Sequence, residues 1–302
     1  MTIETKPYQG VYVAMNSCYD EGGRISTAAV RKNARFLAGA GVQGLYIGGS
    51  SGEGFLQTLD ERKQVLEAVL EEVGSELTVI AQVGCLSTAD SVELAAHAAQ
   101  AGAHAISSVP PFYYAVSEAA VERHWLAMIE AAGLPFIMYH IPAATNFRLS
   151  AGLFGRMLEH PLVAGLKITT PSTYELQRYK ALGGTRFTVF NGPDEQFLAG
   201  RMMGADAGIG GTYGIMPELF VRIERAFRSG DIAAAQRWQF AVNDIIEALL
   251  SLPVYGAIKA LLQLRGLDCG APRLPLEPIG EAHRPAVEVI HARIMREVEA
   301  EG

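Results

Sequence analysis

The sequence predicts an α/β protein built as a (β/α)8 TIM barrel with a C-terminal extension of three helices. Eight apolar segments of strand length recur between residues 10 and 212. Most are continuous rather than alternating, as in strands that are covered on both faces. Segments with helical periodicity separate them, and parallel strands joined by helical crossovers eight times over fit a closed barrel. A doubly wound open sheet is the main alternative for this pattern.

The predicted elements follow in order along the chain. The strands are expected at residues 10–17, 44–49, 77–84, 104–110, 135–142, 163–170, 186–192 and 207–212. Residues 60–73 and 88–101 carry apolar side chains at the i, i+3, i+4, i+7 spacing of helices that lie on a sheet. Helix N-caps are expected at Asp60, Thr88, Ser117, Ser150 and Asp194. Glycines stand where helices should end, at Gly41, Gly102 and Gly133.

The rest of the chain predicts helices at residues 231–250, 253–267 and 281–299. We therefore divide the chain into a barrel, residues 1–230, and a helical extension, residues 231–302.

Composition narrows the class of protein. Of 302 residues, 49% are hydrophobic and 19% are charged, with 25 Lys and Arg against 32 Asp and Glu. This mildly acidic balance argues against a nucleic-acid partner. No apolar stretch reaches the length of a membrane helix, and the N-terminal MTIETKPYQG lacks a signal pattern. We expect a cytoplasmic protein with no membrane partner.

The cysteines and histidines predict neither disulfides nor a metal. Cys18, Cys85 and Cys269 are few, widely separated and odd in number, so free thiols in a reducing compartment are expected. The seven histidines show no metal-binding spacing. We therefore expect no metal site and no cofactor.

Active sites of such barrels lie at the C-terminal ends of the strands, and the predicted strand at 163–170 carries Lys167 there among apolar residues. Lysine is seldom buried without a partner or a task. An interior position would lower its pKa and supply a free amine that can attack a ketone to form a Schiff base. The structural alternative is a lysine whose ammonium reaches solvent or pairs with a carboxylate.

A Schiff-base enzyme also needs a proton relay, and Tyr139 ends the strand expected beside that of Lys167. Neighbouring strands lie roughly 5 Å apart, so the phenol and the amine can point into the same mouth. The alternative for Tyr139 is a buried aromatic residue whose hydroxyl is satisfied by the backbone.

The loop in 44-GLYIGGSSGEGF-55 follows the second predicted strand. Its glycines let backbone N–H groups approach an anion, and Ser50 and Ser51 add hydroxyl donors, so a small carboxylate would fit there. The stretch also matches the G-x-S-x-G elbow of serine hydrolases, but that elbow needs a helix directly after the serine. A phosphate loop would need G-K-[ST], which is absent, and an ordinary tight turn is the remaining alternative.

Several motifs together resemble one family. G-G-S-S-G-E follows the second strand, P-F-Y-Y the fourth, Y-H-I-P lies on the fifth and G-L-K-I-T on the sixth. They resemble the class I pyruvate-dependent aldolases of the N-acetylneuraminate lyase and dihydrodipicolinate synthase superfamily. The likeness covers nearly the whole chain, including 81-AQVGCLST-88 and 204-GADAGIGGTYGIM-216. It is greatest to the N-acetylneuraminate lyases, through F-N-G-P-D-E-Q-F and G-I-G-G-T-Y.

The resemblance implies a lyase, commonly a homotetramer, that cleaves a 2-oxo sugar acid to pyruvate and an aldehyde. Lys167 would form the Schiff base, Tyr139 would relay the proton, and Tyr114 would complete a hydroxyl relay from a neighbouring subunit. The pyruvate carboxylate would be held by Gly49, Ser50 and Ser51. The polyol tail would be bound by Thr169, Gly192, Asp194, Glu195 and the position of Gly211. Asp194 has a second interpretation as the N-cap of the helix that follows it.

Two positions bear on the substrate. Dihydrodipicolinate synthases typically carry an arginine where this chain has Ala144, so the synthase assignment is weakened. N-acetylneuraminate lyases usually have serine where this chain has Gly211, which removes a hydroxyl donor to the sugar. Another aldolase or dehydratase, acting on 2-keto-3-deoxy sugar acids or 4-hydroxy-2-oxoglutarate, therefore remains an alternative. So does a catalytically silent protein that binds 2-oxo acids.

Overall fold

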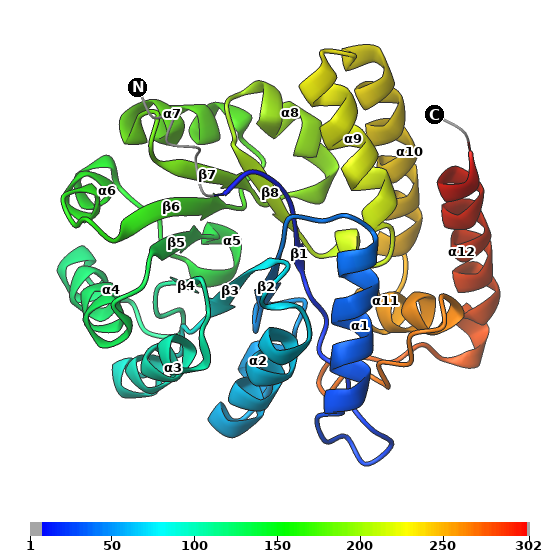
Figure 1. Cartoon of the computed structure of the whole chain (residues 1–302), viewed down its shortest axis with the longest axis horizontal. Helices are drawn as coiled ribbons and strands as arrows, with labels where there is room; N and C mark the ends of the chain where they lie inside the picture. Colours follow the sequence, from blue (N-terminus) through cyan, green and yellow to red (C-terminus); the bar gives the residue numbers. More distant parts are fainter. Residues whose placement is uncertain (1–7, 301–302) are drawn as a thin grey trace.

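The protein, described over residues 8–300 of a computed structural model, is a closed barrel of eight parallel strands in the order β1 to β8 (Figure 1). This confirms the predicted fold, and β8 pairs with β1 to close the barrel. The strands are β1 Gly10–Ala14, β2 Gly44–Ile47, β3 Thr78–Gln82, β4 Ala105–Ser108, β5 Phe136–His140, β6 Val163–Ile168, β7 Thr188–Asn191 and β8 Ala207–Gly210. Each lies within its predicted segment.

Helices surround the barrel; α1 to α8 lie between successive strands, and α9 follows β8 (Figure 1). They are α1 Thr27–Gly39, α2 Leu59–Val73, α3 Thr88–Ala101, α4 Glu118–Ala132, α5 Pro142–Thr145, α6 Ala151–Leu158, α7 Thr173–Gly183, α8 Phe197–Met202 and α9 Pro217–Ser229. Short 3-10 turns are η1 Gly54–Leu56, η2 Asp194–Gln196, η3 Thr212–Gly214 and η4 Glu281–His283. The extension consists of α10 Ile232–Leu250, α11 Val254–Leu264 and α12 Arg284–Glu299.

Two of the predicted N-caps are wrong by one or two residues. Thr58, not Asp60, caps α2, because the Thr58 side chain accepts from the Glu61 N–H while the Glu61 carboxylate accepts from the Thr58 N–H. Such a reciprocal pair satisfies two backbone donors at once. Ser87 rather than Thr88 caps α3. The caps at Ser117 and Ser150 are confirmed.

The buried apolar residues form two clusters that the strands separate. The inner cluster fills the barrel and is dominated by aromatic and branched side chains, among them Tyr12, Tyr46, Ile137, Tyr139 and Phe190. The outer cluster packs the other face of each strand against the helices. Because both faces are covered, the strands are the continuous apolar runs seen in the sequence.

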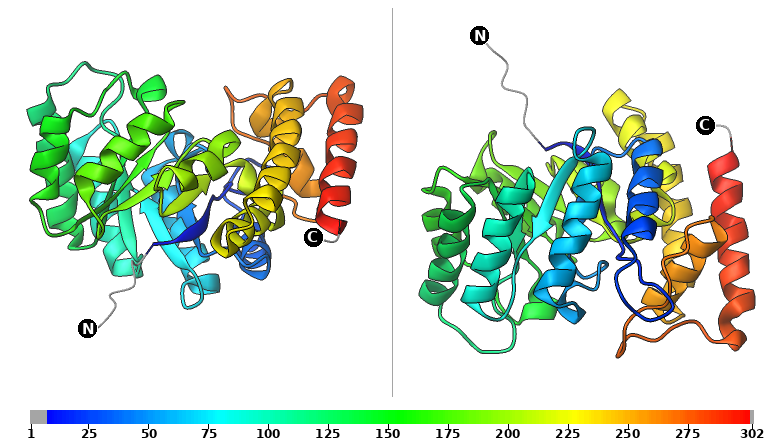
Figure 2. Two further views of the ribbon diagram at one scale, coloured as in Figure 1. Left: turned by 90° about the horizontal axis from the view of Figure 1, so that it is seen from above. Right: turned by 60° about the horizontal axis from the view of Figure 1, so that its bottom comes forward.

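The three helices of the extension lie together at one side of the barrel (Figures 1 and 2). α10 packs along α9 and against α12, and α11 also packs against α12. Gly230, with a φ of 82°, ends α9, and the Asp231 side chain caps α10. The division of the chain at residue 230 stays a prediction.

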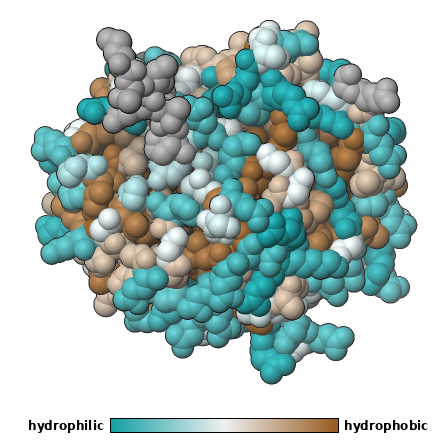
Figure 3. Space-filling view, viewed as in Figure 1, coloured by the Kyte–Doolittle hydropathy of each residue, from teal (hydrophilic) through white to brown (hydrophobic). Residues whose placement is uncertain are grey.

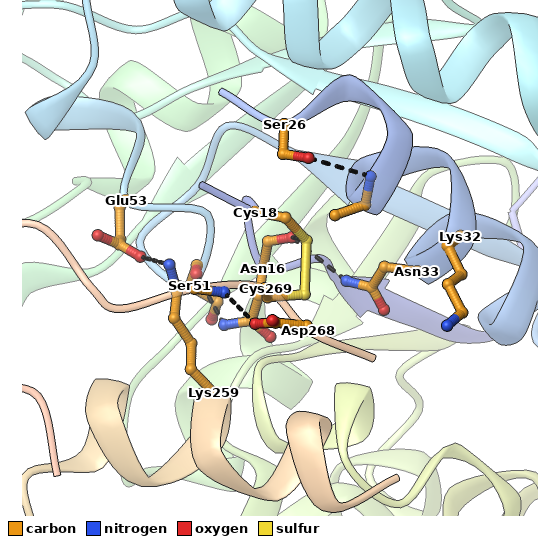
Figure 4. Close-up of a disulfide and its surroundings, with 12 residues drawn as sticks. Asn16, Cys18, Ser26, Lys32, Asn33, Ser51, Glu53, Lys259, Asp268 and Cys269 are labelled. Carbon is orange, nitrogen blue, oxygen red and sulfur yellow. Dashed lines mark hydrogen bonds and ion pairs between the residues drawn. A yellow bond between two sulfur atoms is a disulfide. The ribbon is translucent and has the colours of Figure 1, made fainter. Parts of the chain in front are cut away.

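A disulfide joins the barrel to the extension, so the expectation of free thiols is wrong for Cys18 and Cys269 (Figure 4). Their Cα atoms are 4.0 Å apart although 251 residues separate them in sequence. Cys18 lies in the loop after β1 and Cys269 in the segment after α11, and only the folded chain brings these together. Cys85 is the free cysteine of the described residues.

Polar residues line much of the rim of the face seen in Figure 3, with hydrophobic residues between them. Among the helices of residues 8–300, none alone is long and apolar enough to cross a membrane. Only α10 and α11 taken together reach that length and composition, and they are bent by 119° relative to each other.

Candidate active site

Strands β5 and β6 bring Tyr139 and Lys167 side by side, as the sequence predicts. The two are direct register partners in the parallel ladder. Lys167 is 6% exposed and Tyr139 is 4% exposed. The Lys167 Nζ lies 4.1 Å from the centroid of the Tyr139 ring. The amine is therefore held inside the barrel mouth beside a phenol rather than in open water.

Tyr46 of β2 completes this aromatic setting, and the sequence analysis did not single it out. The Lys167 Nζ lies 4.5 Å from the Tyr46 ring centroid, and the Tyr46 and Tyr139 rings meet edge to face at 6.1 Å. The Tyr46 hydroxyl donates to Ser107 Oγ at 3.0 Å. Burial raises the pKa of Tyr46 well above its usual value, so this phenol stays neutral. A continuous apolar strand does not reveal which residues face inward, which is why Tyr46 was missed.

The loop after β2 is a tight turn in which glycines are required. A Cβ on Gly54 would lie 2.0 Å from the Gly48 carbonyl oxygen, and Gly48 itself has a φ of 75°. The Gly54 N–H donates to the Gly49 oxygen at 3.2 Å and the Glu53 N–H to the Ser50 oxygen at 2.9 Å. The turn leads into η1, and α2 begins only at Leu59, so the serine-hydrolase elbow is ruled out.

Gly49, Ser50 and Ser51 occupy different depths in this turn. Gly49 is buried, Ser51 is half-buried and Ser50 is exposed at the mouth. The Asn16 amide, at the end of β1, donates to the Ser51 carbonyl at 2.9 Å. Hydroxyl and N–H groups clustered in this way can bind a small carboxylate.

Gly211 lies directly against the same turn. A Cβ on Gly211 would be 2.4 Å from the Ser51 Oγ, so glycine leaves the space that the Ser51 hydroxyl occupies. Gly211 follows β8, and β1 lies between β8 and β2. The structure thus brings together two predicted site positions that are 160 residues apart in the sequence.

Asp194 is a buried acceptor at the end of β7, and its interpretation as a helix N-cap is wrong. Its Oδ2 accepts from the Thr212 N–H at 2.7 Å and from the Thr212 hydroxyl at 2.6 Å. The N-cap of α8 is Gln196, with no side-chain capping bond, because the chain makes the 3-10 turn η2 first. Burial raises the pKa of Asp194 to about 6, and the Thr212 hydrogen bonds oppose that shift. The charge of Glu195 raises it further, which places that carboxylate nearby.

Glu195 is exposed, and its backbone oxygen accepts from the Asn243 amide of α10 at 3.0 Å. Thr169 and Gly192, which end β6 and β7, face each other. A Cβ on Gly192 would lie 2.0 Å from the Thr169 Oγ1. In the described part of the chain this buried Oγ1 has no hydrogen-bond partner. Buried polar atoms are rarely left unpaired, so this hydroxyl is suited to a bound ligand.

Tyr114 stands apart from the other predicted residues. It lies in the loop between β4 and α4, is 69% exposed, and packs edge to face on Tyr113 at 5.1 Å. Its ring contacts Tyr113 rather than Lys167 or Tyr139. Within one chain, therefore, Tyr114 is not part of the buried group around the amine.

The extension also reaches the site, which the sequence analysis did not anticipate. Tyr255 of α11 shares with Ser50 and Glu53 a cavity of about 210 Å³. Burial raises the pKa of Tyr255, and Tyr139 and the Glu53 carboxylate raise it further. The signal in the sequence was 253-PVYGAIKALL-262, where Tyr255 and a lysine interrupt an apolar helix.

Arg148 does not replace the arginine that is missing at Ala144. Arg148 is exposed, and its charge lowers the pKa of His140, which burial lowers more strongly and Glu175 opposes. His140 follows Tyr139 in β5 and packs on Tyr179 of α7, outside the barrel. Successive strand residues point to opposite faces, so His140 points away from the Tyr139 side of β5. Burial raises the pKa of Tyr179 and lowers that of His140, and in both cases the charge of Arg148 lowers the pKa, which places Arg148 on this outer side.

Comparisons with known proteins identify the family to which this chain belongs. The model of the dihydrodipicolinate synthetase family matches residues 7–293. The N-acetylneuraminate lyase of Mediterraneibacter gnavus is 41% identical over 89% of this chain and 87% of its own. The N-acetylneuraminate lyase of Salmonella agona is 38% identical over 97% of this chain and 99% of its own. The structure of a catalytic lysine mutant of the Ruminococcus gnavus sialic acid aldolase is 38% identical and superimposes with a TM-score of 0.95, covering 97% of each chain.

Proposed function

This chain belongs to the dihydrodipicolinate synthetase family, and from that premise we propose that it is an N-acetylneuraminate lyase. It would cleave the sugar acid to pyruvate and an aldehyde through a Schiff base on Lys167. The relatives that share 37–41% identity carry that name, which supports the substrate. The observation that carries the chemistry is the buried Lys167 amine, held between the rings of Tyr46 and Tyr139.

The proposed reaction begins when the Lys167 amine attacks the C2 carbonyl of the open-chain sugar acid. Loss of water gives an iminium ion, which is an electron sink. Tyr139, after giving its phenol proton to the C2 oxygen that leaves as water, accepts the proton of the C4 hydroxyl. The C3–C4 bond breaks, and its electron pair moves into the iminium to form the enamine of pyruvate. The aldehyde leaves, C3 takes up a proton, and water releases pyruvate from the lysine.

Different residues around Lys167 would bind the carboxylate and the hydroxyl tail of the substrate. The turn of Gly49, Ser50 and Ser51 would take the carboxylate of the substrate. Thr169, Gly192, Asp194 and Glu195 would face the hydroxyls of the tail, and the unpaired Thr169 Oγ1 supports that assignment. Gly211 would shape the space between the two regions, because it abuts Ser51.

A second candidate, an aldolase or dehydratase for a shorter 2-oxo acid, is favoured by one observation. Serine at position 211 would offer the sugar a hydroxyl, whereas Gly211 offers none. A lost hydrogen bond typically costs about 0.5–1.5 kcal/mol. A dihydrodipicolinate synthase is less well supported, because Ala144 and the outward Arg148 leave no guanidinium for a second carboxylate.

Release of pyruvate across a substrate panel tests the assignment. The panel contains N-acetylneuraminate, 2-keto-3-deoxygluconate and 4-hydroxy-2-oxoglutarate, with condensation of pyruvate and aspartate semialdehyde assayed in parallel. We expect the highest kcat/KM for N-acetylneuraminate. A higher value for one of the shorter acids would transfer the assignment to the second candidate.

We further propose a homotetramer in which Tyr114 enters a neighbouring active site, supported by its 69% exposure. Sedimentation of the wild-type protein tests the assembly, and the kcat of a Tyr114→Phe variant of unchanged sedimentation tests the role of the hydroxyl. Location in the cytoplasm stays a prediction. The Cys18–Cys269 disulfide argues against a location in the cytoplasm, because disulfides are rare in reducing compartments.

A further inference from the structure

A buried ion pair connects the extension to the carboxylate-binding turn. Lys259 of α11 reaches Glu53 with its Nζ 2.8 Å from the Glu53 Oε1, and the two side chains are 2% and 0% exposed (Figure 4). The other oxygen, Oε2, accepts from the Arg273 N–H at 2.8 Å. Both oxygens of Glu53 are thus held by residues that lie more than 200 positions later in the chain.

Glu53 occupies an unusual backbone position. Its φ of 55° and ψ of 29° are left-handed, and within residues 8–300 only Asn146 shares a positive φ among non-glycine residues. Such a conformation persists only where the surroundings fix it. Glu53 ends the serine turn, because its N–H donates to the Ser50 oxygen at 2.9 Å. What holds the Glu53 side chain therefore holds the turn.

The lysine end of the pair is fixed as well. The Lys259 Nζ donates to the Ala271 oxygen at 3.2 Å and lies 4.1 Å from the Tyr19 ring centroid. Arg273 packs on the same ring at 4.5 Å and bonds Glu61 through its Nη1 at 2.7 Å. Burial lowers the pKa of Lys259, and the Glu53 carboxylate opposes that shift.

A buried pair of this kind is poor evidence for stability, because desolvation offsets much of the attraction between the charges. Its better-attested use is to select one geometry over others. Here the geometry selected is that of the turn that carries Ser50 and Ser51. Tyr255, four residues before Lys259 on α11, lines a cavity together with Ser50 and Glu53 of the same turn.

We propose that Glu53 and Lys259 are positioning residues that hold Ser50 and Ser51 in place for the carboxylate of the 2-oxo acid. The inference rests on the proposed function, since it assigns that turn to the substrate carboxylate. It adds that the extension is part of the active site's framework. Neither residue needs to touch the reacting atoms.

Trapping with borohydride tests the proposal, because it reports pyruvate binding and imine formation at Lys167 separately. The concentration of pyruvate that gives half-maximal trapping measures carboxylate binding, and the maximal extent measures imine chemistry. Lys259→Met should raise the half-maximal concentration by about tenfold or more, as when a hydrogen bond involving a charged group is lost. The maximal extent of trapping should be unchanged.

Two further variants separate positioning from folding. Glu53→Gln with Lys259→Met removes both charges, which proteins often tolerate, and should show a similar shift in half-maximal pyruvate. Asp206→Asn breaks a partly buried ion pair, Lys180–Asp206, at the opposite end of the barrel. It should lower the melting temperature and leave half-maximal pyruvate unchanged.

Borohydride trapping is measured on the wild-type protein first. Absence of trapping there would remove the proposed function, and the inference with it. Trapping in the wild type together with wild-type pyruvate dependence in the double variant would overturn the inference alone. A shift in Asp206→Asn as large as that in Lys259→Met would also overturn it, since both would then reflect lost stability.

Discussion

The two ends of the barrel differ in how well the buried polar side chains are hydrogen-bonded. At the N-terminal end, Asp206 pairs with Lys180 at 2.7 Å and also accepts from the Val189 N–H at 2.9 Å. Gln43 likewise accepts from the Val11 N–H at 2.7 Å. These side chains complete the hydrogen bonding of strand ends and connect the strands.

At the C-terminal mouth, by contrast, two buried polar atoms of the described part of the chain lack partners: Asn16 Oδ1 and Thr169 Oγ1. Thr188 Oγ1 is an example at the other end, so the contrast is one of degree. Unpaired buried groups are costly, and a ligand can supply what they lack. The N-terminal end therefore stabilises the fold, while the mouth is built to receive a substrate.

Removal of the amine should have the largest effect. Lys167→Met should lower kcat/KM at least about a thousandfold, because no other group supplies the nucleophile. The free energy of unfolding should not fall, since methionine suits the aromatic surroundings of Lys167. Steady-state kinetics and urea unfolding measure the two effects. Activity within tenfold of wild type would contradict the role of Lys167.

Loss of the phenol hydroxyl comes next. Tyr139→Phe should reduce kcat by about 10²–10⁴-fold, the usual contribution of a positioned proton donor or acceptor. Tyr12→Phe is the matched control, because Tyr12 is equally buried and packs on Phe190 inside the barrel. Its kcat should stay near the wild-type value. Equal losses in both variants would mean that the measurement reports packing.

The raised pKa of Asp194 should make the free energy of unfolding depend on pH. This pKa of about 6 in the folded protein exceeds the ordinary 3.8, so the folded state holds the proton more tightly. The stabilisation is fully present below about pH 4 and is lost as the pH rises through 6, amounting to roughly 3 kcal/mol. Urea unfolding between pH 4 and pH 7 measures it. The free energy of unfolding of the wild type should fall relative to that of Asp194→Asn by this amount as the pH rises. A difference between the two proteins that does not change with pH would contradict the raised pKa of Asp194.

Gly211→Ser should give the smallest change. The new Cβ would meet the Ser51 Oγ at 2.4 Å, so the Ser51 hydroxyl must rotate. Half-maximal pyruvate in borohydride trapping should rise about two- to tenfold, as for one weakened hydrogen bond. A decrease would show that a serine at 211 binds the carboxylate itself.

The fold could be predicted because continuous apolar strands and amphipathic helices mark a barrel independently of tertiary detail. The site could be predicted where one residue carries unusual chemistry, as with Lys167 in an apolar strand. The second interpretation of Asp194, as a helix N-cap, was wrong because the true partner of its carboxylate, Thr212, lies 18 residues later. The Cys18–Cys269 bond and the Glu53–Lys259 pair were missed for the same physical reason. Contacts between distant segments leave no periodic pattern in a single sequence.

One measurement tests the central claim that a buried amine at the end of β6 forms a Schiff base. The protein is incubated with pyruvate and borohydride, digested, and its peptides are identified by mass. We predict that the mass of reduced pyruvate is added to Lys167 and that the Lys167→Met variant gains none. Modification of another lysine, or an unmodified wild-type protein, would contradict the account.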